Sequence, residues 1–200
     1  MPPISHRLQI KVGPDILNRI QIPEVHHGSK LSCIPDRCTH KKILSDYVDK
    51  IEENISKPKG LLLFGEFASG KSSCAAICLK ASAFRGIIGF WIRAVNIPKY
   101  QIEKTIFDDE MTVIERALSV PILVIDELII RDEVKYTEEV LEFLVRSRID
   151  DKLCTIITTN HAPAYIEKKF PALLSALKEA VLPIKVTGHN FRDKIAEELT

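Results

Sequence analysis

The chain has 200 residues, of which 46 % are hydrophobic and 28 % are charged, a composition typical of one globular domain with a full core. Its formal net charge of +1 excludes a strongly basic nucleic-acid-binding protein, although it allows a local basic patch. No apolar run approaches the roughly 20 residues that a bilayer-spanning helix needs, and the opening MPPISHRLQIKVG lacks the apolar core of a signal peptide. We therefore expect a soluble protein with no membrane partner.

The first 38 residues differ from the rest in their proline content. Five prolines, Pro2, Pro3, Pro14, Pro23 and Pro35, stand among scattered apolar residues. We expect residues 1–38 to form an extension with at most short helices or strands, whose role, if it has one, is to bind a partner. Residues 39–200 are expected to form the main domain.

The cysteines raise the question of a metal. Cys33 and Cys38, with His40 and the His26-His27 pair, invite a zinc interpretation, but the spacing C-x4-C-x-H matches no tight zinc pattern. An extension without a metal is favoured. The other three cysteines, Cys74, Cys78 and Cys154, are expected to be small buried residues in a reducing compartment.

The first half of the main domain contains strand and helix signals in alternation. Residues 39–56 have the apolar spacing of a helix that Thr39 can cap. A strand over residues 61–64 and a helix over 71–84, ended by Gly86, follow. The apolar run IIGFWI predicts a strand over 87–92, and one or two helices are expected within 98–119, with a break near Asp108-Asp109.

The second half continues this alternation. Strands are predicted over 121–126, 153–159 and 181–186, and helices over 136–149, after Pro163, over 171–180 and over 190–199. Because the five strand segments are almost continuously apolar and alternate with helices, the fold class is α/β with a five-stranded parallel sheet covered on both faces. Ligands of such a fold bind at the carboxyl ends of the strands.

A phosphate-binding loop follows the first strand. Residues 65–72 read GEFASGKS, the pattern G-x-x-x-x-G-K-S between a strand and a helix. Its glycines allow backbone N–H groups to approach a polyphosphate, Lys71 supplies charge to the outer phosphates, and Ser72 can bind Mg²⁺. The expected nucleotide-binding residues are Gly65, Glu66, Phe67, Ala68, Ser69, Gly70, Lys71, Ser72 and Ser73. The ligand is therefore expected to be ATP with Mg²⁺.

Polar residues end two other predicted strands at the same edge. PILVIDEL (121–128) ends in Asp126 and Glu127, of which the first would hold Mg²⁺ and the second would orient the attacking water. Asn160 follows Thr158-Thr159 and can bond the γ-phosphate or the water, although an asparagine in this place is often only a turn former. The catalytic set is therefore Lys71, Asp126, Glu127 and Asn160.

The order of these motifs resembles that of the AAA+ ATPases. GLLLFGEFASGKS (60–72), PILVIDEL (121–128), TIITTN (155–160) and LPIKVTGHNFR (182–192) are similar to the Walker A, Walker B and sensor 1 motifs and to the strand-Gly-x-x-x-Arg ending of DnaC-type helicase loaders and IstB-like transposition helpers. The resemblance covers residues 33–195. The chain is similar to these loaders in having no C-terminal helical lid, and the short residues 1–38 fit a compact phage-encoded loader or a truncated chain.

The resemblance implies a function in DNA replication. Such a loader would be a cytoplasmic ATPase that forms a homo-oligomer on single-stranded DNA and hands over a replicative helicase. Arg192 would contact the nucleotide or a neighbouring subunit, unless it forms a surface ion pair with Asp193 or Glu197. Single-stranded DNA would meet Arg93, Lys99, Tyr100 and Lys104, which otherwise form a solvated helix face.

One position departs from the family pattern. Family members carry an arginine finger in the helix before the last strand, where this chain has Ala176. Either the finger is missing, or Lys178, Arg146 or Arg148 replaces it. Three alternatives to the loader stay open. They are a transposition helper of the same fold, an adaptor that binds ATP without hydrolysing it, which Ala176 suggests, and, with less support, a small-molecule kinase.

Overall fold

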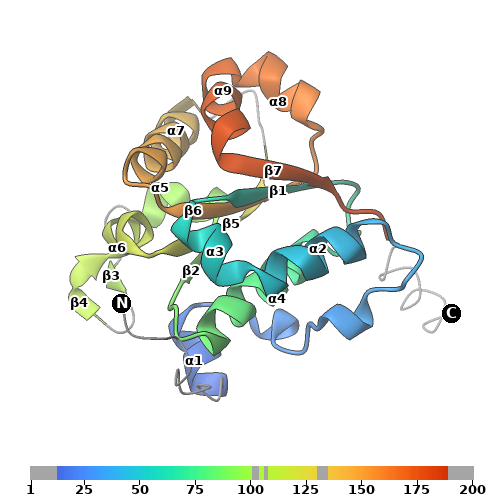
Figure 1. The fold of residues 1–200 in the computed structure, drawn as a ribbon. Coiled ribbons are helices and arrows are strands. Elements are labelled where there is room, and N and C mark those ends of the chain that lie inside the picture. Colours follow the sequence, from blue (N-terminus) through green and yellow to red (C-terminus); the bar gives the residue numbers. More distant parts are fainter. Residues whose placement is uncertain (1–12, 101–103, 106–107, 130–134, 189–200) are drawn as a thin grey trace, which may run out of the picture.

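A parallel β-sheet forms the centre of the protein in the computed structural model, which describes residues 13–100, 104–105, 108–129 and 135–188 (Figure 1). The strand order is β2-β5-β6-β1-β7, and each neighbouring pair is parallel. The strands are β1 (Gly60–Phe64), β2 (Phe90–Arg93), β5 (Ile122–Leu128), β6 (Cys154–Thr159) and β7 (Val181–Lys185). This arrangement confirms the predicted α/β class and the five-stranded parallel sheet.

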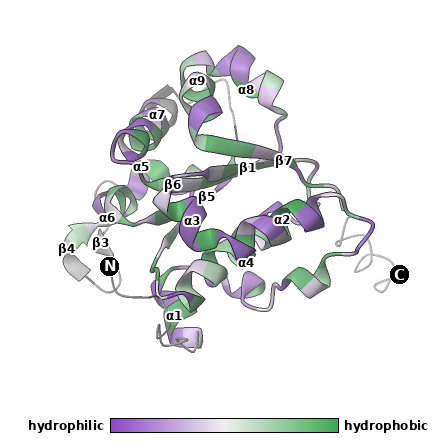
Figure 2. Ribbon diagram, in the orientation of Figure 1, coloured by the Kyte–Doolittle hydropathy of each residue, from purple (hydrophilic) through white to green (hydrophobic). Residues whose placement is uncertain are grey.

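Helices cover both faces of this sheet (Figure 1). One face packs against α2 (His40–Asp49), α3 (Ile51–Ser56) and α4 (Lys71–Phe84), and the N-terminal α1 (Pro14–Arg19) lies on the same side. The other face packs against α5 (Ile97–Tyr100), α6 (Val113–Ser119), α7 (Lys135–Asp150), α8 (Pro163–Lys169) and α9 (Pro171–Ala180). Figure 2 shows that apolar residues concentrate on the strands and on α4, whereas the outer helices also carry many hydrophilic residues.

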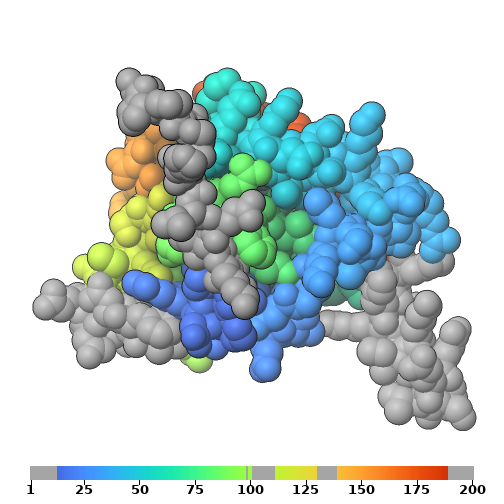
Figure 3. Space-filling model, turned by 60° about the horizontal axis from the view of Figure 1, so that its bottom comes forward, coloured from blue at the N-terminus to red at the C-terminus, as the bar shows by residue number. Residues whose placement is uncertain are grey.

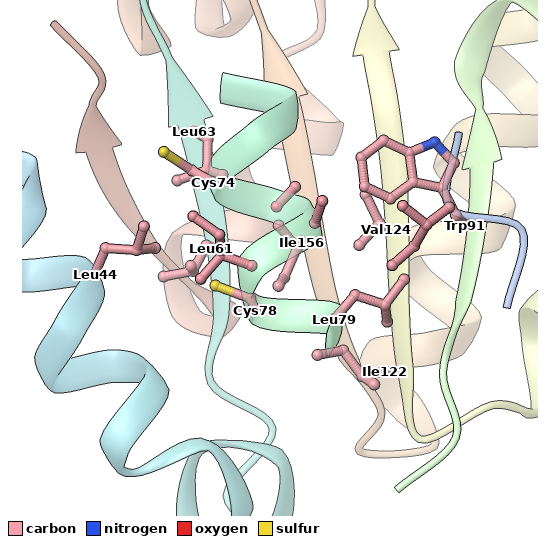
Figure 4. Close-up of a cluster of buried hydrophobic side chains, with 14 of the residues drawn as sticks. Leu44, Leu61, Leu63, Cys74, Cys78, Leu79, Trp91, Ile122, Val124 and Ile156 are labelled. Atoms are coloured by element: carbon pink, nitrogen blue, oxygen red, sulfur yellow. The ribbon is translucent and has the colours of Figure 1, made fainter. Parts of the chain in front are cut away.

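The helix that follows the phosphate loop is buried on nearly every side. Cys74, Cys78 and Leu79 of α4 pack against strand residues such as Leu61 and Ile156, as Figure 4 shows. Burial raises the pKa of the Cys74 thiol to about 12, so it is a neutral apolar group at physiological pH. The expected burial of Cys74, Cys78 and Cys154 is confirmed.

Three expectations about local structure are wrong. The helix expected over residues 39–56 is two helices, and the side chain of Thr39 makes no capping hydrogen bond because its backbone already has helical angles. The region 98–119 contains a hairpin of β3 (Lys104–Thr105) and β4 (Asp108–Thr112) before α6. Thr112 and Glu115 form a reciprocal capping box, which fixes the start of α6 after the hairpin. The helix expected over 190–199 lies outside the described residues.

The described part of the N-terminal extension packs on the sheet and on α4. Leu17, Ile20 and Ile22 are buried in the same apolar cluster as Trp91, whose backbone N–H donates to the Ile20 carbonyl at 3.0 Å. Trp91 is 2 % exposed, so its ring is part of the core. Short 3-10 turns at Glu24–His26 and Leu31–Cys33 continue the segment. Figure 3 shows it in blue against the green residues of the central part of the chain.

A buried lysine of α4 holds this segment in place. The Lys80 ammonium, 9 % exposed as a residue, donates to the carbonyls of His26 (3.4 Å), His27 (2.9 Å) and Ser29. Burial lowers its pKa, and the carbonyl oxygens compensate for the lost water. The segment is therefore fixed to the helix that follows the phosphate loop.

None of the helices in the described ranges is long and apolar enough to cross a membrane.

A buried arginine joins α6, α7 and β6. Arg148 is fully buried, and its guanidinium donates to the Thr155 hydroxyl (3.0 Å) and to the carbonyls of Ala117 (2.5 Å), Val120 (3.0 Å) and Cys154 (2.6 Å). Burial lowers its pKa to about 10, which still leaves the group charged at neutral pH. Arg148 is thus a structural group that satisfies carbonyls at the ends of two elements.

We expect Arg148→Met to lower the free energy of unfolding by about 2–4 kcal/mol, because each buried carbonyl left without a donor costs about 1–3 kcal/mol. Urea denaturation followed by circular dichroism measures this change. Arg146→Met on the same helix is the matched control, since its exposed ion pair with Glu142 contributes about 1 kcal/mol or less. Equal losses in the two variants would contradict the structural role of Arg148.

Candidate nucleotide-binding site

The loop between β1 and α4 needs glycine at its first position. Gly65 has φ +152°, and a Cβ atom built on it would lie 2.3 Å from the carbonyl oxygen of Val186. Gly70, at φ +96°, precedes α4, and Ala68 also has a positive φ of +56°. The loop therefore lies directly against the chain that leaves β7, and its backbone has the tight turns of a phosphate-binding loop.

Lys71 is held inside this loop. Its ammonium donates to the carbonyls of Gly65 (3.1 Å) and Glu66 (2.5 Å) and to the Ser69 hydroxyl (3.4 Å). Burial lowers the pKa of Lys71, and the negative charge of Asp126 opposes that shift. The loop thus holds a largely buried cation at the amino end of a 14-residue helix, a combination that fits a polyphosphate.

One carboxylate oxygen connects three elements of the site. Oδ1 of Asp126 accepts the Ser72 hydroxyl at 2.8 Å and the Thr158 hydroxyl at 2.6 Å. Asp126 is only 3 % exposed. The structure therefore brings Ser72 of α4 to the carboxyl end of β5, as the sequence predicted. A hydroxyl and a carboxylate are hard oxygen donors, so these two side chains fit Mg²⁺.

Glu127 points differently from Asp126 because the strand is irregular there. The pairing of β5 with β6 shifts register between Ile125 and Leu128, and Glu127 has φ +57° and an exposed side chain. Its backbone N–H donates to the Thr158 hydroxyl at 2.9 Å. A non-glycine residue with a positive φ is strained, and such strain often occurs at functional sites. The bulge separates a buried acid from a neighbouring acid in contact with solvent.

Thr158 is the residue of this site to which the sequence analysis assigned no role. Its hydroxyl donates to Asp126 and accepts from the Glu127 backbone, so it positions both acids. The sequence feature that could have indicated this role is a hydroxyl residue in an otherwise apolar strand, two residues before Asn160. Asn160 itself is half-buried directly after β6. Its side chain makes no hydrogen bond to the residues that the structure describes, so its amide is available.

A cavity adjoins the loop on the side of the N-terminal segment. Its volume is about 590 Å³, within the usual range of small-molecule sites. The lining comes from the N-terminal segment, the phosphate loop, α4 and the chain after β7, namely Ser29, Lys30, Cys33, Ile34, Pro35, Arg37, Cys38, His40, Ser69, Gly70, Ser73, Cys74, Ile77, Thr187 and Gly188. The sequence singled out Cys33, Cys38 and His40 only as a possible zinc pattern, and no motif indicated that this segment reaches the loop, because only the tertiary fold brings it there.

The candidates for an arginine finger are placed differently from one another. Ala176 is half-buried on α9, and Lys178 on the same helix forms an exposed ion pair with Glu167 at 2.6 Å. Arg146 donates to the Glu142 carboxylate at 2.7 Å and to the Ala172 carbonyl at 3.1 Å. Arg148 is fully buried, so the idea that it replaces the finger is wrong. Lys178 and Arg146 are the two candidates with surface access.

The candidate DNA-binding residues do not form a uniform surface. Arg93 and Lys99 are exposed. Tyr100 is half-buried against an apolar cluster, and its hydroxyl accepts from the Asn96 amide at 3.3 Å, so its ring is not a free stacking surface. The side chain of Lys104 and the whole of Arg192 lie outside the described residues.

Among the residues that are described, no group of three or more His, Cys, Asp or Glu is arranged to hold a metal ion.

The loop, the acids on β5 and the sheet order together have the arrangement of the AAA+ fold. The structure is similar to the DnaC helicase loader, with a TM-score of 0.70 and 19 % identity over 82 % of this chain and 100 % of that one. It is also similar to DnaI, with a TM-score of 0.69 and 19 % identity over 85 % and 94 % of the two chains. At these identities the likeness establishes the fold.

A replication initiator shares the same core. DnaA bound to AMPPCP and single-stranded DNA has a TM-score of 0.65 and 12 % identity over 90 % of this chain and 55 % of its own. No protein-family model and no curated protein sequence matches the chain. The resemblance drawn from the motifs is thus confirmed at the level of the AAA+ fold of loaders and initiators.

We expect Gly65→Ala to lower the free energy of unfolding by about 1–3 kcal/mol, because the new Cβ atom would press on the Val186 carbonyl at a backbone angle unfavourable for alanine. Thermal unfolding measures the change. Gly28→Ala is the control, since its Cβ would meet nothing within 4 Å. A loss at Gly28 as large as at Gly65 would show that the close contact with Val186 is not the cause.

Proposed function

We propose that the chain binds Mg²⁺–ATP at this loop, hydrolyses it, and works as the ATPase of a helicase loader in DNA replication. The observation that carries the proposal is the shared carboxylate of Asp126. It gathers Ser72 from the phosphate-loop helix and Thr158 from β6 at the edge where Lys71 lies. An ATPase needs a cation, a magnesium ligand pair and a carboxylate for water within one small region.

Each residue has a distinct task in this proposal. Lys71 exchanges the carbonyls of its own loop for phosphate oxygens, which offer full negative charge. Ser72 and Asp126 hold the magnesium ion, which when bound neutralises charge on the phosphates. Glu127, exposed beside them, accepts a hydrogen bond from the attacking water, and Asn160 supplies a neutral amide near the same place.

The cavity is the proposed place for the nucleoside. It begins at Ser69, Gly70 and Ser73 of the phosphate loop and helix and extends toward the N-terminal segment. A triphosphate on the loop would therefore direct its ribose and base into this space. In this proposal residues 29–38 form a wall of the nucleotide site, in addition to any role in binding a partner.

The loader function rests on likeness to other proteins. The structures with this fold include a helicase loader and an initiator bound to AMPPCP and single-stranded DNA. By analogy we propose a replicative helicase and single-stranded DNA as partners, and a homo-oligomer as the active form. Exposed Arg93, the last residue of β2, and exposed Lys99 of α5 are the described residues that support DNA contact.

A second candidate function follows from the finger position. Ala176 cannot reach a neighbour's phosphates, and Arg148 is buried, so an adaptor that binds ATP without turnover is the main alternative. Steady-state hydrolysis with and without single-stranded DNA separates the two functions. DNA-stimulated turnover supports the loader, whereas tight binding without turnover supports the adaptor. A transposition helper would instead associate with duplex DNA and a transposase.

We expect Glu127→Gln to retain ATP binding and to lower the turnover number about 100-fold or more, the usual contribution of a general base. Lys71→Ala should weaken ATP binding about 100-fold or more, since hydrogen bonds to charged groups are each worth about 1.5–3 kcal/mol. Calorimetry measures binding, and phosphate release measures turnover.

Asp49→Asn, an exposed change on α2, is the control for both variants. Unchanged turnover in Glu127→Gln would remove Glu127 from the role of orienting water. Unchanged ATP affinity in Lys71→Ala would overturn the assignment of the site.

A further inference from the structure

The cavity beside the phosphate loop has basic side chains but no acidic ones in its described lining. The apolar residues Ile34 and Pro35 of the N-terminal segment and Ile77 of α4 line it. Its charged lining residues are Lys30 and Arg37. Among the described lining residues there is no carboxylate. The side chains can therefore offer hydrogen-bond donors and apolar contact, a combination that suits a flat heterocycle with acceptor nitrogens.

His40 is one of the buried polar side chains of this lining. It is the first residue of α2, is 3 % exposed, and lies against the chain that leaves β7. The backbone N–H of Thr187 donates to its Nδ1 at 3.3 Å. Because a backbone N–H can only donate, Nδ1 must be the ring nitrogen without a proton.

The other ring nitrogen then carries the proton. Burial lowers the pKa of His40, so the ring is neutral at physiological pH and its single N–H is at Nε2. His40 makes no second hydrogen bond to the part of the chain that the structure describes. In that same part, Nε1 of Trp91 is the side-chain nitrogen or oxygen that is both fully buried and without a partner. Because Nε2 of His40 has no partner there either, it is not fully buried and reaches open space. The open space beside His40 is the cavity.

We infer that His40 contacts the nucleobase, with its Nε2–H donating to a ring nitrogen of the base. The inference rests on the proposed function, because it requires the phosphates on the loop. Ile34 and Pro35 of the N-terminal segment and Ile77 of α4 would hold the two faces of the base. The bond to Thr187 fixes the ring and its tautomer, so the donor is oriented before the ligand arrives.

The decisive variant is His40→Asn, because the asparagine oxygen can replace Nδ1 as acceptor for Thr187 while the Nε2 donor is lost. Calorimetry on the full chain should show ATP bound about 3- to 10-fold more weakly, the value of one hydrogen bond. Inorganic tripolyphosphate, which has no base, should bind both proteins equally. Equal ATP affinity in the two proteins would overturn the inference.

ATP analogues identify the acceptor. In 1-deaza-, 3-deaza- and 7-deaza-ATP, one ring nitrogen at a time is replaced by carbon. One of the three should bind the native chain more weakly than ATP does, and this difference should vanish in His40→Asn. If all three lose affinity equally in both proteins, or none loses any, His40 does not contact a ring nitrogen.

A second variant separates base contact from folding. His40→Gln can place an amide N–H near the position of Nε2 but loses the acceptor for Thr187, so ATP affinity should rank native, Gln, Asn from tightest to weakest. The reverse order of the two variants would overturn the inference. If Lys71→Ala binds tripolyphosphate as well as the native chain does, the phosphate site itself fails. Normal phosphate binding with an unaffected His40→Asn contradicts only the base contact.

Discussion

The two hydrogen bonds that meet at one oxygen of Asp126 determine the geometry of the whole site. They join the start of α4, the end of β5 and the end of β6 through Ser72 and Thr158. Asp126 is only 3 % exposed, so its carboxylate would be costly to bury without hydrogen-bond partners. The hydroxyl groups remove that cost, and they also keep the phosphate loop at a fixed distance from the acids.

The same constraint explains the irregular end of β5. Thr158 accepts the Glu127 backbone N–H while it donates to Asp126, so the chain must turn outward between the two acids. One threonine thus gives adjacent carboxylates different surroundings, the first buried among hydroxyl groups and the second exposed. Two acids with different environments can perform different tasks in a reaction.

The sequence was sufficient for the sheet and for the main features of the site. Near-continuous apolar runs can be buried only in a sheet covered on both faces, and the loop motif is local, so Lys71, Ser72 and Asp126 were found directly. The hairpin before α6 was missed because its strands are short and polar. The roles of Thr158, His40 and Arg148 depend on contacts between residues 6 to 147 positions apart, which no sequence motif contains.

The three carbonyls held by Lys80 have a mechanical consequence. Besides the apolar contacts of the N-terminal segment, the Lys80 ammonium holds three of its carbonyls to the helix of the phosphate loop, and the same segment supplies Ser29 and Lys30 to the cavity wall. A protein that pulled this segment away would have to break the Lys80 contacts and open the cavity in one movement. A movement of the N-terminal segment would therefore change the volume available beside the loop.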